Sequence, residues 1–210
     1  MHDRRIGDTA HVFGNYGALW MNAMTWYDHE TQSIWTQPLG RALTGPLKGT
    51  QLKIIPYSLV PWSTWREEHP DTLALIAERG SFRGQEPPTD NFVIGVAIGD
   101  VARGYVYPAV ANRIVVNDQL GDIPVVVHVN PENRNIHVFS RELNDGTVLT
   151  FTGDENQLID EATGSVFDPS RGIGLAGEYS GVGLRELPYI SSFDWAWLDF
   201  YPHTDFYTGR

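Results

Sequence analysis

The 210-residue sequence contains no cysteine, which excludes disulfide bonds, thiol catalysis and thiolate metal ligands. Charged residues make up only 20% of the chain, and acidic residues outnumber basic ones to give a net charge of −11. Because the chain has no cluster of Lys and Arg to neutralise phosphates, we do not expect a nucleic-acid partner. No apolar run reaches the roughly 18 residues of a membrane span. We therefore predict no transmembrane segment, and the first residues, MHDRRIGDTAHVF, lack the apolar core of a signal peptide.

Turn-forming and apolar residues are abundant instead. The sequence has 21 Gly, 13 Pro and seven Trp, and 41% of its residues are hydrophobic. This composition is typical of a globular chain that turns often, and it favours short strands over long helices. We predict a mostly β fold, of the β-rich α+β kind, with many short antiparallel strands and hairpins and few short helices.

An internal repeat organises the chain. Asp28–Thr72 aligns without a gap on Asp160–Thr204, 132 residues later, and 13 of the 45 aligned positions are identical. Most of the identical residues are turn formers, aromatics and core apolars, which specify a backbone path rather than chemistry. We therefore predict an internal duplication: an incomplete first repeat module over residues 1–78, a linker over 79–91 and a complete second repeat module over 92–210.

The repeat also predicts one unusual backbone conformation. The turn that begins at Asp160 has Gly164 where a type I turn with a bulge requires a left-handed residue. The first copy has Gln32 at this position. We therefore expect a positive φ at Gln32.

Two histidines form the best candidate for a metal site. Two β-branched runs flank the loop Pro131–Arg134, and pairing the runs about this loop sets His128 opposite His137. Directly opposed residues have Cβ atoms roughly 4.5–5.5 Å apart, close enough for two imidazoles to share a transition metal. Two ligands are fewer than the three or four that a zinc or copper site uses. The interpretation that we favour is a solvated cross-strand pair on the polar face of the hairpin, with metal binding as the alternative.

Other motifs favour structure over catalysis. Asp28, Thr31 and Ser33 recur as Asp160, Thr163 and Ser165, but a hydroxyl nucleophile needs a neighbouring base and the histidine at position 29 is Glu161 in the second copy. The stretch Gly172–Gly177 matches G-x-G-x-x-G without the strand and helix of a dinucleotide site, so we interpret it as a turn. We assign no catalytic and no cofactor-binding residue, and the sequence requires no cofactor.

Aromatic residues are the candidates for an interface, because such residues anchor protein contacts. Several lie in the first module and in the C-terminal stretch FDWAWLDFYPHTDFY. The candidate interface residues are Trp20, Trp26, Trp195, Phe206 and Tyr207.

Several segments in order carry a family resemblance: TWYDHETQSIWTQPLGRALTGPLKG, YVYPAVANRIVVNDQLGDIPVVV and DEATGSVFD. Nearly the whole chain resembles the prokaryotic family known as domain of unknown function 3179. The resemblance implies a secreted or lipid-anchored protein, periplasmic or extracellular, without an assigned activity. It also implies an upstream half of the first repeat that ends in a Cys-Pro-x-Cys turn. The first copy here lacks counterparts of about Phe92–Phe139, and the corresponding turn of the second copy is Asn130-Pro131-Glu132-Asn133.

These observations predict a non-catalytic, β-rich binding or assembly module, an extracytoplasmic accessory or subunit of a larger complex. We expect a protein partner or self-association through the incomplete first module, since an uncovered apolar face or sheet edge favours association. The alternative is an extracytoplasmic protein with a His-based metal site, either redox-active or hydrolytic, and a hydrolase with a hydroxyl nucleophile is a third hypothesis.

Overall fold

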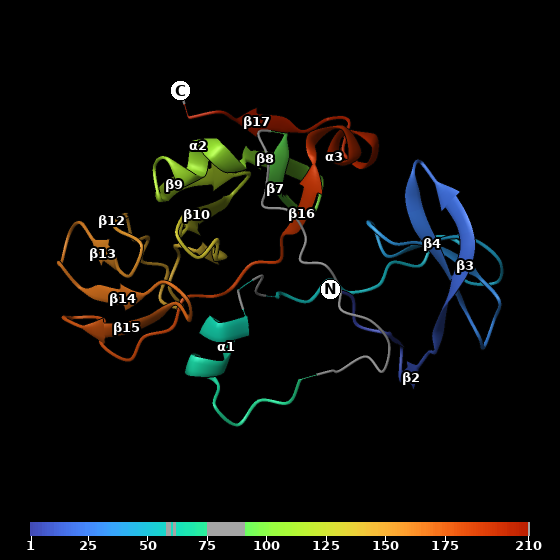
Figure 1. The fold of residues 1–210 in the computed structure, drawn as a ribbon, viewed down its shortest axis with the longest axis horizontal. Coiled ribbons are helices and arrows are strands. Elements are labelled where there is room, and N and C mark those ends of the chain that lie inside the picture. Colours follow the sequence, from blue (N-terminus) through green and yellow to red (C-terminus); the bar gives the residue numbers. More distant parts are fainter. Residues whose placement is uncertain (58–59, 61, 75–90, 210) are drawn as a thin grey trace. The chain divides into compact units, whose positions relative to one another are not determined.

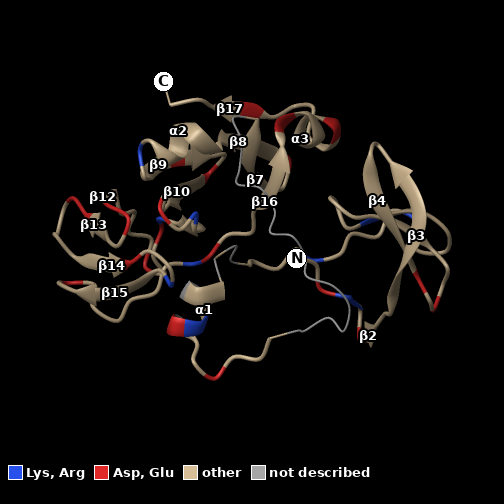
Figure 2. Ribbon diagram, in the orientation of Figure 1, with Lys and Arg blue, Asp and Glu red and all other residues tan. Residues whose placement is uncertain are grey.

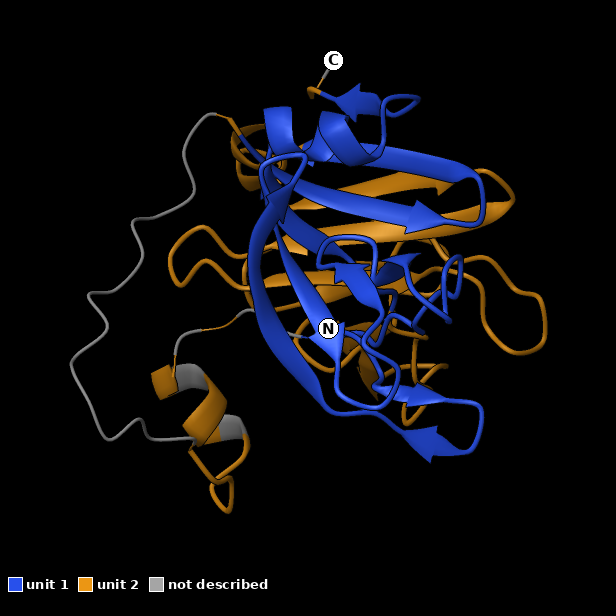
Figure 3. Ribbon diagram, turned by 90° about the vertical axis from the view of Figure 1, so that its right-hand side faces the viewer, with its two compact units in different colours: residues 1–57, 92–105, 187–207 blue, residues 58–91, 106–186, 208–210 orange. Residues whose placement is uncertain are grey.

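The computed structural model describes residues 1–57, 60, 62–74 and 91–209 (Figure 1). Short antiparallel strands dominate, and the described part of the chain has three short helices, which confirms the predicted fold class. Most of the predicted linker lies outside the described residues. The chain divides into two compact units (Figure 3). Unit 1 comprises residues 1–57, 92–105 and 187–207, and unit 2 comprises residues 58–91, 106–186 and 208–210.

Unit 1 begins with a small hairpin and a four-stranded antiparallel meander. In the meander each strand pairs with the next along the chain, so β3 lies at one edge. The hairpin consists of β1 (Arg5–Ile6) and β2 (Thr9–Ala10), and the meander of β3 (Phe13–Trp20), β4 (Ala23–Asp28), β5 (Ile34–Thr36) and β6 (Arg41–Thr44). Fully buried Trp35 lies at the centre of a small core beneath this meander.

The second sheet of unit 1 has the order β16-β7-β8-β17, and β17 is parallel to β8. Its elements are β7 (Phe92–Ile98), β8 (Val101–Val106), β16 (Ile190–Phe193) and β17 (Asp205–Tyr207), with α3 (Asp194–Phe200) between the last two strands. Trp197 of α3 packs so closely on Gly95 of β7 that a Cβ there would lie 2.3 Å from the indole ring. A glycine is therefore required where this helix meets the sheet.

Unit 2 contains a three-stranded sheet of order β11-β10-β9 and two helices. These elements are α1 (Trp62–Glu68), α2 (Tyr107–Ala111), β9 (Val115–Leu120), β10 (Ile123–Val129) and β11 (Ile136–Ser140). The hairpin predicted about Pro131–Arg134 forms between β10 and β11, and consecutive strands also pair about Gly99-Asp100 and Gly121-Asp122.

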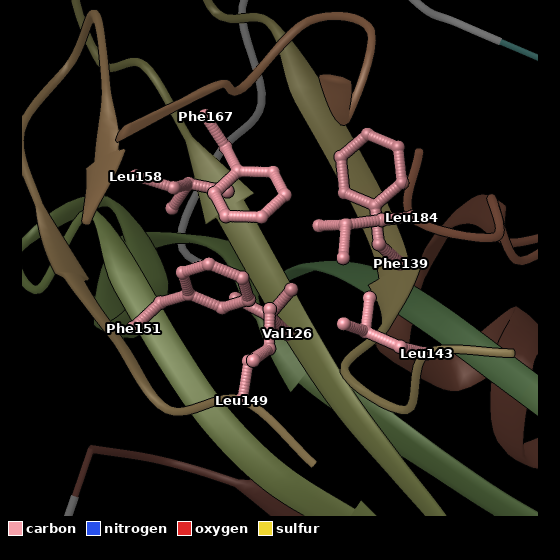
Figure 4. Packing of buried hydrophobic residues seen from close by; sticks show 8 residues of the cluster. All are labelled: Val126, Phe139, Leu143, Leu149, Phe151, Leu158, Phe167 and Leu184. Carbon is pink, nitrogen blue, oxygen red and sulfur yellow. The ribbon is translucent and has the colours of Figure 1, made fainter. Parts of the chain in front are cut away.

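A second meander completes unit 2. It consists of β12 (Phe151–Gly153), β13 (Leu158–Asp160), β14 (Val166–Asp168) and β15 (Ile173–Ala176), again with each strand beside the next. Apolar side chains from this meander and from the β9–β11 sheet form one buried cluster (Figure 4). Its members are Val126, Phe139, Leu143, Leu149, Phe151, Leu158, Phe167 and Leu184.

The two meanders follow the same path, which confirms the duplication. At the interval of 132 residues, β5 maps onto β14, β6 onto β15 and α1 onto α3, with identical bounds. In both repeats the indole of the helix donates to a threonine hydroxyl at 2.9 Å, Trp65 to Thr72 and Trp197 to Thr204. Each turn closes in the same way, because Thr31 and Thr163 donate their amides to the carboxylates of Asp28 and Asp160. Gln32 has a φ of 58° and Gly164 a φ of 70°, so the predicted left-handed residue is confirmed.

Hydrogen bonds extend the correspondence upstream, where the interval changes slightly. The bridge between His2 and Ile54 matches the bridge between Phe139 and Glu186. The amides of His11 and Leu149 donate to the carbonyls of Arg4 and Arg141. Phe13 and Phe151 pair with the repeat-related aspartates. The repeat-related pairs are therefore His2 with Phe139, Arg4 with Arg141, His11 with Leu149 and Phe13 with Phe151.

The histidine pair of the β10–β11 hairpin lies where it was predicted, but the solvated environment that we favoured is wrong. His128 pairs with His137, and their ring centroids are 6.5 Å apart. The two side chains are only 1% and 2% exposed. The face is covered because the loop between β12 and β13 lies over it: the ring Nε2 of His128 lies 3.0 Å from the carbonyl oxygen of Asp154.

Charge is spread thinly along the described chain. In Figure 2 the Lys and Arg segments are short and separated from one another. Within the described residues, no helix has the length and apolar character needed to cross a bilayer.

Candidate functional site

A large cavity marks the first repeat. It has a volume of about 820 Å³ and is lined only by residues of unit 1. Most of its wall is apolar or aromatic, while Arg4, His2 and His11 contribute polar groups. One part of the wall comes from the first repeat and another from residues 190–201. A concave apolar site with a few polar groups is the usual form of a binding site.

The cavity occupies a place that is filled in the second repeat. Five first-repeat residues of its wall correspond to five members of the buried cluster around Val126 of β10 (Figure 4). The wall residues are His2, His11, Phe13, Trp26 and Leu52, and their counterparts are Phe139, Leu149, Phe151, Leu158 and Leu184. Among the described residues of the first repeat none corresponds to Val126, because counterparts are present there for the end of β11 but not for β9 or β10. In the second repeat, Val126 of β10 lies among the counterparts of these wall residues.

The edge of the first meander is also open. In the second repeat, Asn117 of β9 accepts the amide hydrogen of Phe151 at 2.9 Å and donates to its carbonyl at 2.6 Å. Asn117 thereby satisfies the outward backbone groups of edge strand β12. The described part of the first repeat provides no counterpart of β9 beside Phe13 on β3. The sheet edge there is free to accept another strand.

Apolar side chains are exposed along the same hairpin. Six of the eight residues of β3 are exposed to solvent. The larger exposed apolar residues of β3, of its connection to β4 and of the start of β4 are Tyr16 (52% exposed), Leu19 (69%), Trp20 (37%), Met21 (39%) and Met24 (36%). Clusters of this kind mark interaction surfaces more often than isolated apolar residues do.

A second feature of the first repeat is a cluster of ionisable side chains at the end of β4. The Nδ1 atom of His11 lies 3.5 Å from Oδ1 of Asp28 and 3.5 Å from Oε2 of Glu30. His11 is 6% exposed, Asp28 is fully buried and Glu30 is exposed. The three potential ligand atoms lie within 4.8 Å of one another, and among the described residues they form the only group of three or more such donors.

Asp28 is held as a carboxylate. Burial raises the pKa of Asp28, but hydrogen bonds from the Trp35 indole at 2.8 Å and from Thr31 lower it by more, so that the pKa lies below its usual range. Donors that bond to the charged form favour that form.

The histidine pair of unit 2 provides fewer ligands. Burial and, to a smaller extent, the neighbouring His128 lower the pKa of His137 to about 4. Burial also lowers the pKa of His128. Neutral imidazoles suit a metal, but no third donor lies close enough among the described residues to make a group of three with them. Metal binding by His128 and His137 stays a prediction.

The repeated hydroxyl groups serve the turns. Thr31 and Ser33 lie 2.7 Å apart, Ser33 is fully buried, and its oxygen accepts the amide hydrogen of Leu47. Thr163, Ser165 and Tyr179 reproduce this arrangement in the second repeat. In both copies the threonine hydroxyl also donates to the turn aspartate, Thr31 to Asp28 and Thr163 to Asp160. The same bonds in both copies fit a structural role.

The five predicted interface residues are distributed over unit 1. Trp20 is 37% exposed and lies near Phe200, while half-buried Trp26 lines the cavity. Trp195 is 49% exposed, and Phe206 and Tyr207 are half-buried in β17. Their role as an interface stays a prediction.

Sequence reasoning missed the cluster of His11, Asp28 and Glu30. His11 carries no spacing signal, and Asp28 has a sufficient role in its turn. An alignment that placed His11 opposite Leu149 would have shown the difference, but that alignment requires the shifted interval that the hydrogen bonds reveal.

Comparison with known proteins agrees with the duplicated architecture. No curated protein and no solved structure matches the chain. The sequence pattern of one family matches twice, over residues 1–89 and 82–204. Since these two matches together span nearly all of its length, the chain belongs to the protein family of unknown function DUF3179.

Proposed function

We propose that this protein is a non-catalytic binding and assembly module whose first repeat accepts an extended segment of another polypeptide. The observation that carries the proposal is the cavity, whose first-repeat wall corresponds to the residues that surround Val126 in the second repeat. The strand that carries Val126 in the second repeat therefore serves as the guide to the segment that we propose for the first repeat.

The comparison also defines the chemistry of the segment. Its side chains should alternate between the two faces as in a strand. A β-branched residue should point into the cavity, at the position that Val126 occupies in the second repeat. A side-chain amide on the neighbouring strand, equivalent to Asn117, which pairs directly with Val126, would bond to the open edge of β3. Addition of a strand to a free edge combines backbone hydrogen bonds with specificity from side-chain pockets.

A separate polypeptide fits this role better than a second copy of the chain. All residues of β11, and all but the first residue of β10, are buried in unit 2. A second copy could supply these strands only by exposing its own core. We also propose a location outside the cytoplasm, which is supported by the family resemblance alone.

The experiment uses a synthetic peptide with the sequence of residues 114–130, which carries both Asn117 and Val126 and contains no aromatic residue. The peptide is titrated into the intact protein, and binding is followed by calorimetry and by tryptophan fluorescence, because Trp26 lines the cavity. The matched control is the same peptide with Val126→Asp, which would bury an unpaired charge.

We expect saturable binding of one peptide per chain, weakened at least about tenfold by the aspartate, which corresponds to about 1.4 kcal/mol. Equal binding of the two peptides, or no binding up to the solubility limit, would overturn the proposal. Analytical ultracentrifugation of the protein alone completes the test: a stable dimer would show that a second copy is the occupant and would contradict the assignment to a separate polypeptide.

A further inference from the structure

Three differences between the repeats converge on one carboxylate. Asp28 and Asp160 hold the same turn, but the side chains around them differ. In the first repeat an imidazole, a second carboxylate and an indole surround Asp28, where the second repeat has apolar side chains. The substituted pairs are His11 for Leu149, Glu30 for Ala162 and Trp35 for Phe167. A turn alone does not require them, since Asp160 closes its turn without them.

The hydrogen bonds are rearranged accordingly. In the second repeat the amide of Thr150 donates to Oδ1 of Asp160. The corresponding amide of Val12 donates instead to the Glu30 carboxylate, at 3.1 Å to each oxygen. Oδ1 of Asp28 therefore accepts the Thr31 amide at 2.6 Å but not the Val12 amide, and it lies 3.5 Å from Nδ1 of His11, while the other oxygen accepts the Trp35 indole. Bonds of this kind orient the ligands in metal sites.

The distances suit a small divalent cation. Zinc binds nitrogen and oxygen ligands at about 2.0–2.2 Å, so two ligands of a tetrahedral ion lie about 3.3–3.6 Å apart. The two distances of 3.5 Å from Nδ1 of His11 fall within this range. They are too long for good hydrogen bonds, and the buried Nδ1 atom makes none. A buried nitrogen without a hydrogen bond therefore points at two carboxylates.

We propose that Nδ1 of His11, Oδ1 of Asp28 and Oε2 of Glu30 bind one divalent transition-metal ion of the zinc type. Two carboxylates and a neutral imidazole carry a charge of −2, which the ion balances. Three protein ligands leave a fourth position for water or another ligand. This site is distinct from the pair of His128 and His137, and it does not depend on strand binding by the first repeat.

The test measures binding of Zn²⁺ to the intact, metal-free protein by calorimetry and of Co²⁺ by visible absorption, which reports the coordination geometry. The decisive variant is His11→Leu/Glu30→Ala, which gives the first repeat the residues of the second and should therefore fold. The matched control is His29→Gln, because His29 is an exposed histidine of the same turn that stacks on Tyr27 and lies outside the cluster. Circular dichroism confirms the fold of each variant.

We expect one Zn²⁺ per chain, a rise of the melting temperature with Zn²⁺, and four- or five-coordinate absorption bands with Co²⁺. The double variant should bind at least roughly 100-fold more weakly, because loss of even an outer contact costs about 10–100-fold, and His29→Gln should bind as the unmodified protein does. Absence of binding would show that the three side chains form an ion-pair cluster only and would overturn the proposal. Undiminished binding by the double variant would overturn it equally, and would direct attention to His128 and His137.

Discussion

The two repeats share one backbone path but differ in what fills it. In the second repeat, β10 places Val126 in the core, and Asn117 of β9 closes the edge of β12. In the first repeat the same place is a cavity with half-exposed walls, and the edge of β3 is open. Both copies share turn residues and hydrogen bonds, so these residues suffice to establish the backbone path of the meander. A complete core requires a further sheet, and among the described residues only the second repeat has one.

The difference also distinguishes Asp160, which serves its turn, from Asp28, which we propose to bind a metal as well. Asp160 is bonded within its own turn and by the amide of Thr150. Asp28 has the same turn bonds and, in addition, His11, Glu30 and Trp35 around it. A duplicated chain contains its own reference, because one copy shows what the turn requires and the other shows what has been added.

The largest expected effect on stability comes from truncating the two repeat-related phenylalanines, Phe151 and Phe13. Phe151 is 2% exposed in the filled core, so Phe151→Ala should lower the free energy of unfolding by about 3–5 kcal/mol. Phe13 is only half-buried at the cavity wall, and Phe13→Ala should cost about 1–2 kcal/mol. Urea denaturation followed by circular dichroism measures both losses. Equal losses would mean that the first core is packed as well as the second.

Acid should lower the free energy of unfolding through His137, which lies on β11 of the β9–β11 sheet. Burial, aided by His128, lowers the pKa of His137 to about 4, so the folded state binds fewer protons than the unfolded state between that pH and about 6.5. Stability is therefore intact above about pH 6.5 and falls as the pH drops towards 4, by on the order of 3 kcal/mol for this group. Urea denaturation at a series of pH values should show a smaller acid loss for His137→Leu than for the unmodified protein. The control is His203→Leu at an exposed position, and an unchanged acid loss in His137→Leu would contradict the prediction.

The smallest expected effect on stability comes from exchanging the two turn residues that have a positive φ, Gln32 and Gly164. Gln32→Gly should raise the free energy of unfolding by about 0.5–1 kcal/mol, because glycine adopts a positive φ without the usual penalty. The reverse change, Gly164→Gln, should lower it by about 1 kcal/mol through the backbone alone, since no atom lies within 4 Å of a Cβ at that position. Thermal unfolding measures both, and a shift of the same sign in the two variants would refute the common turn geometry.

Local features of the fold could be predicted because their causes are local. The hairpin about Pro131–Arg134 and the positive φ of Gln32 follow from turn residues that act on their own backbone. The burial of His128 and His137 could not be predicted in this way. Strand periodicity shows which side chains share a face, but not whether another segment covers it. Here the loop at Asp154 covers that face, and nothing in the hairpin itself specifies the cover.

The sequence by itself determined the mostly β class, the duplication and the turn that each repeat closes around its aspartate. Glycines, prolines and aspartates act within a few residues of themselves, so their effects can be read along the chain. Only the tertiary structure decided that the first repeat encloses a cavity, and that His11 meets Asp28 and Glu30. Both features depend on which distant segments pack together. The cavity wall and the three side chains of the cluster come from separate segments, so no single segment specifies either feature.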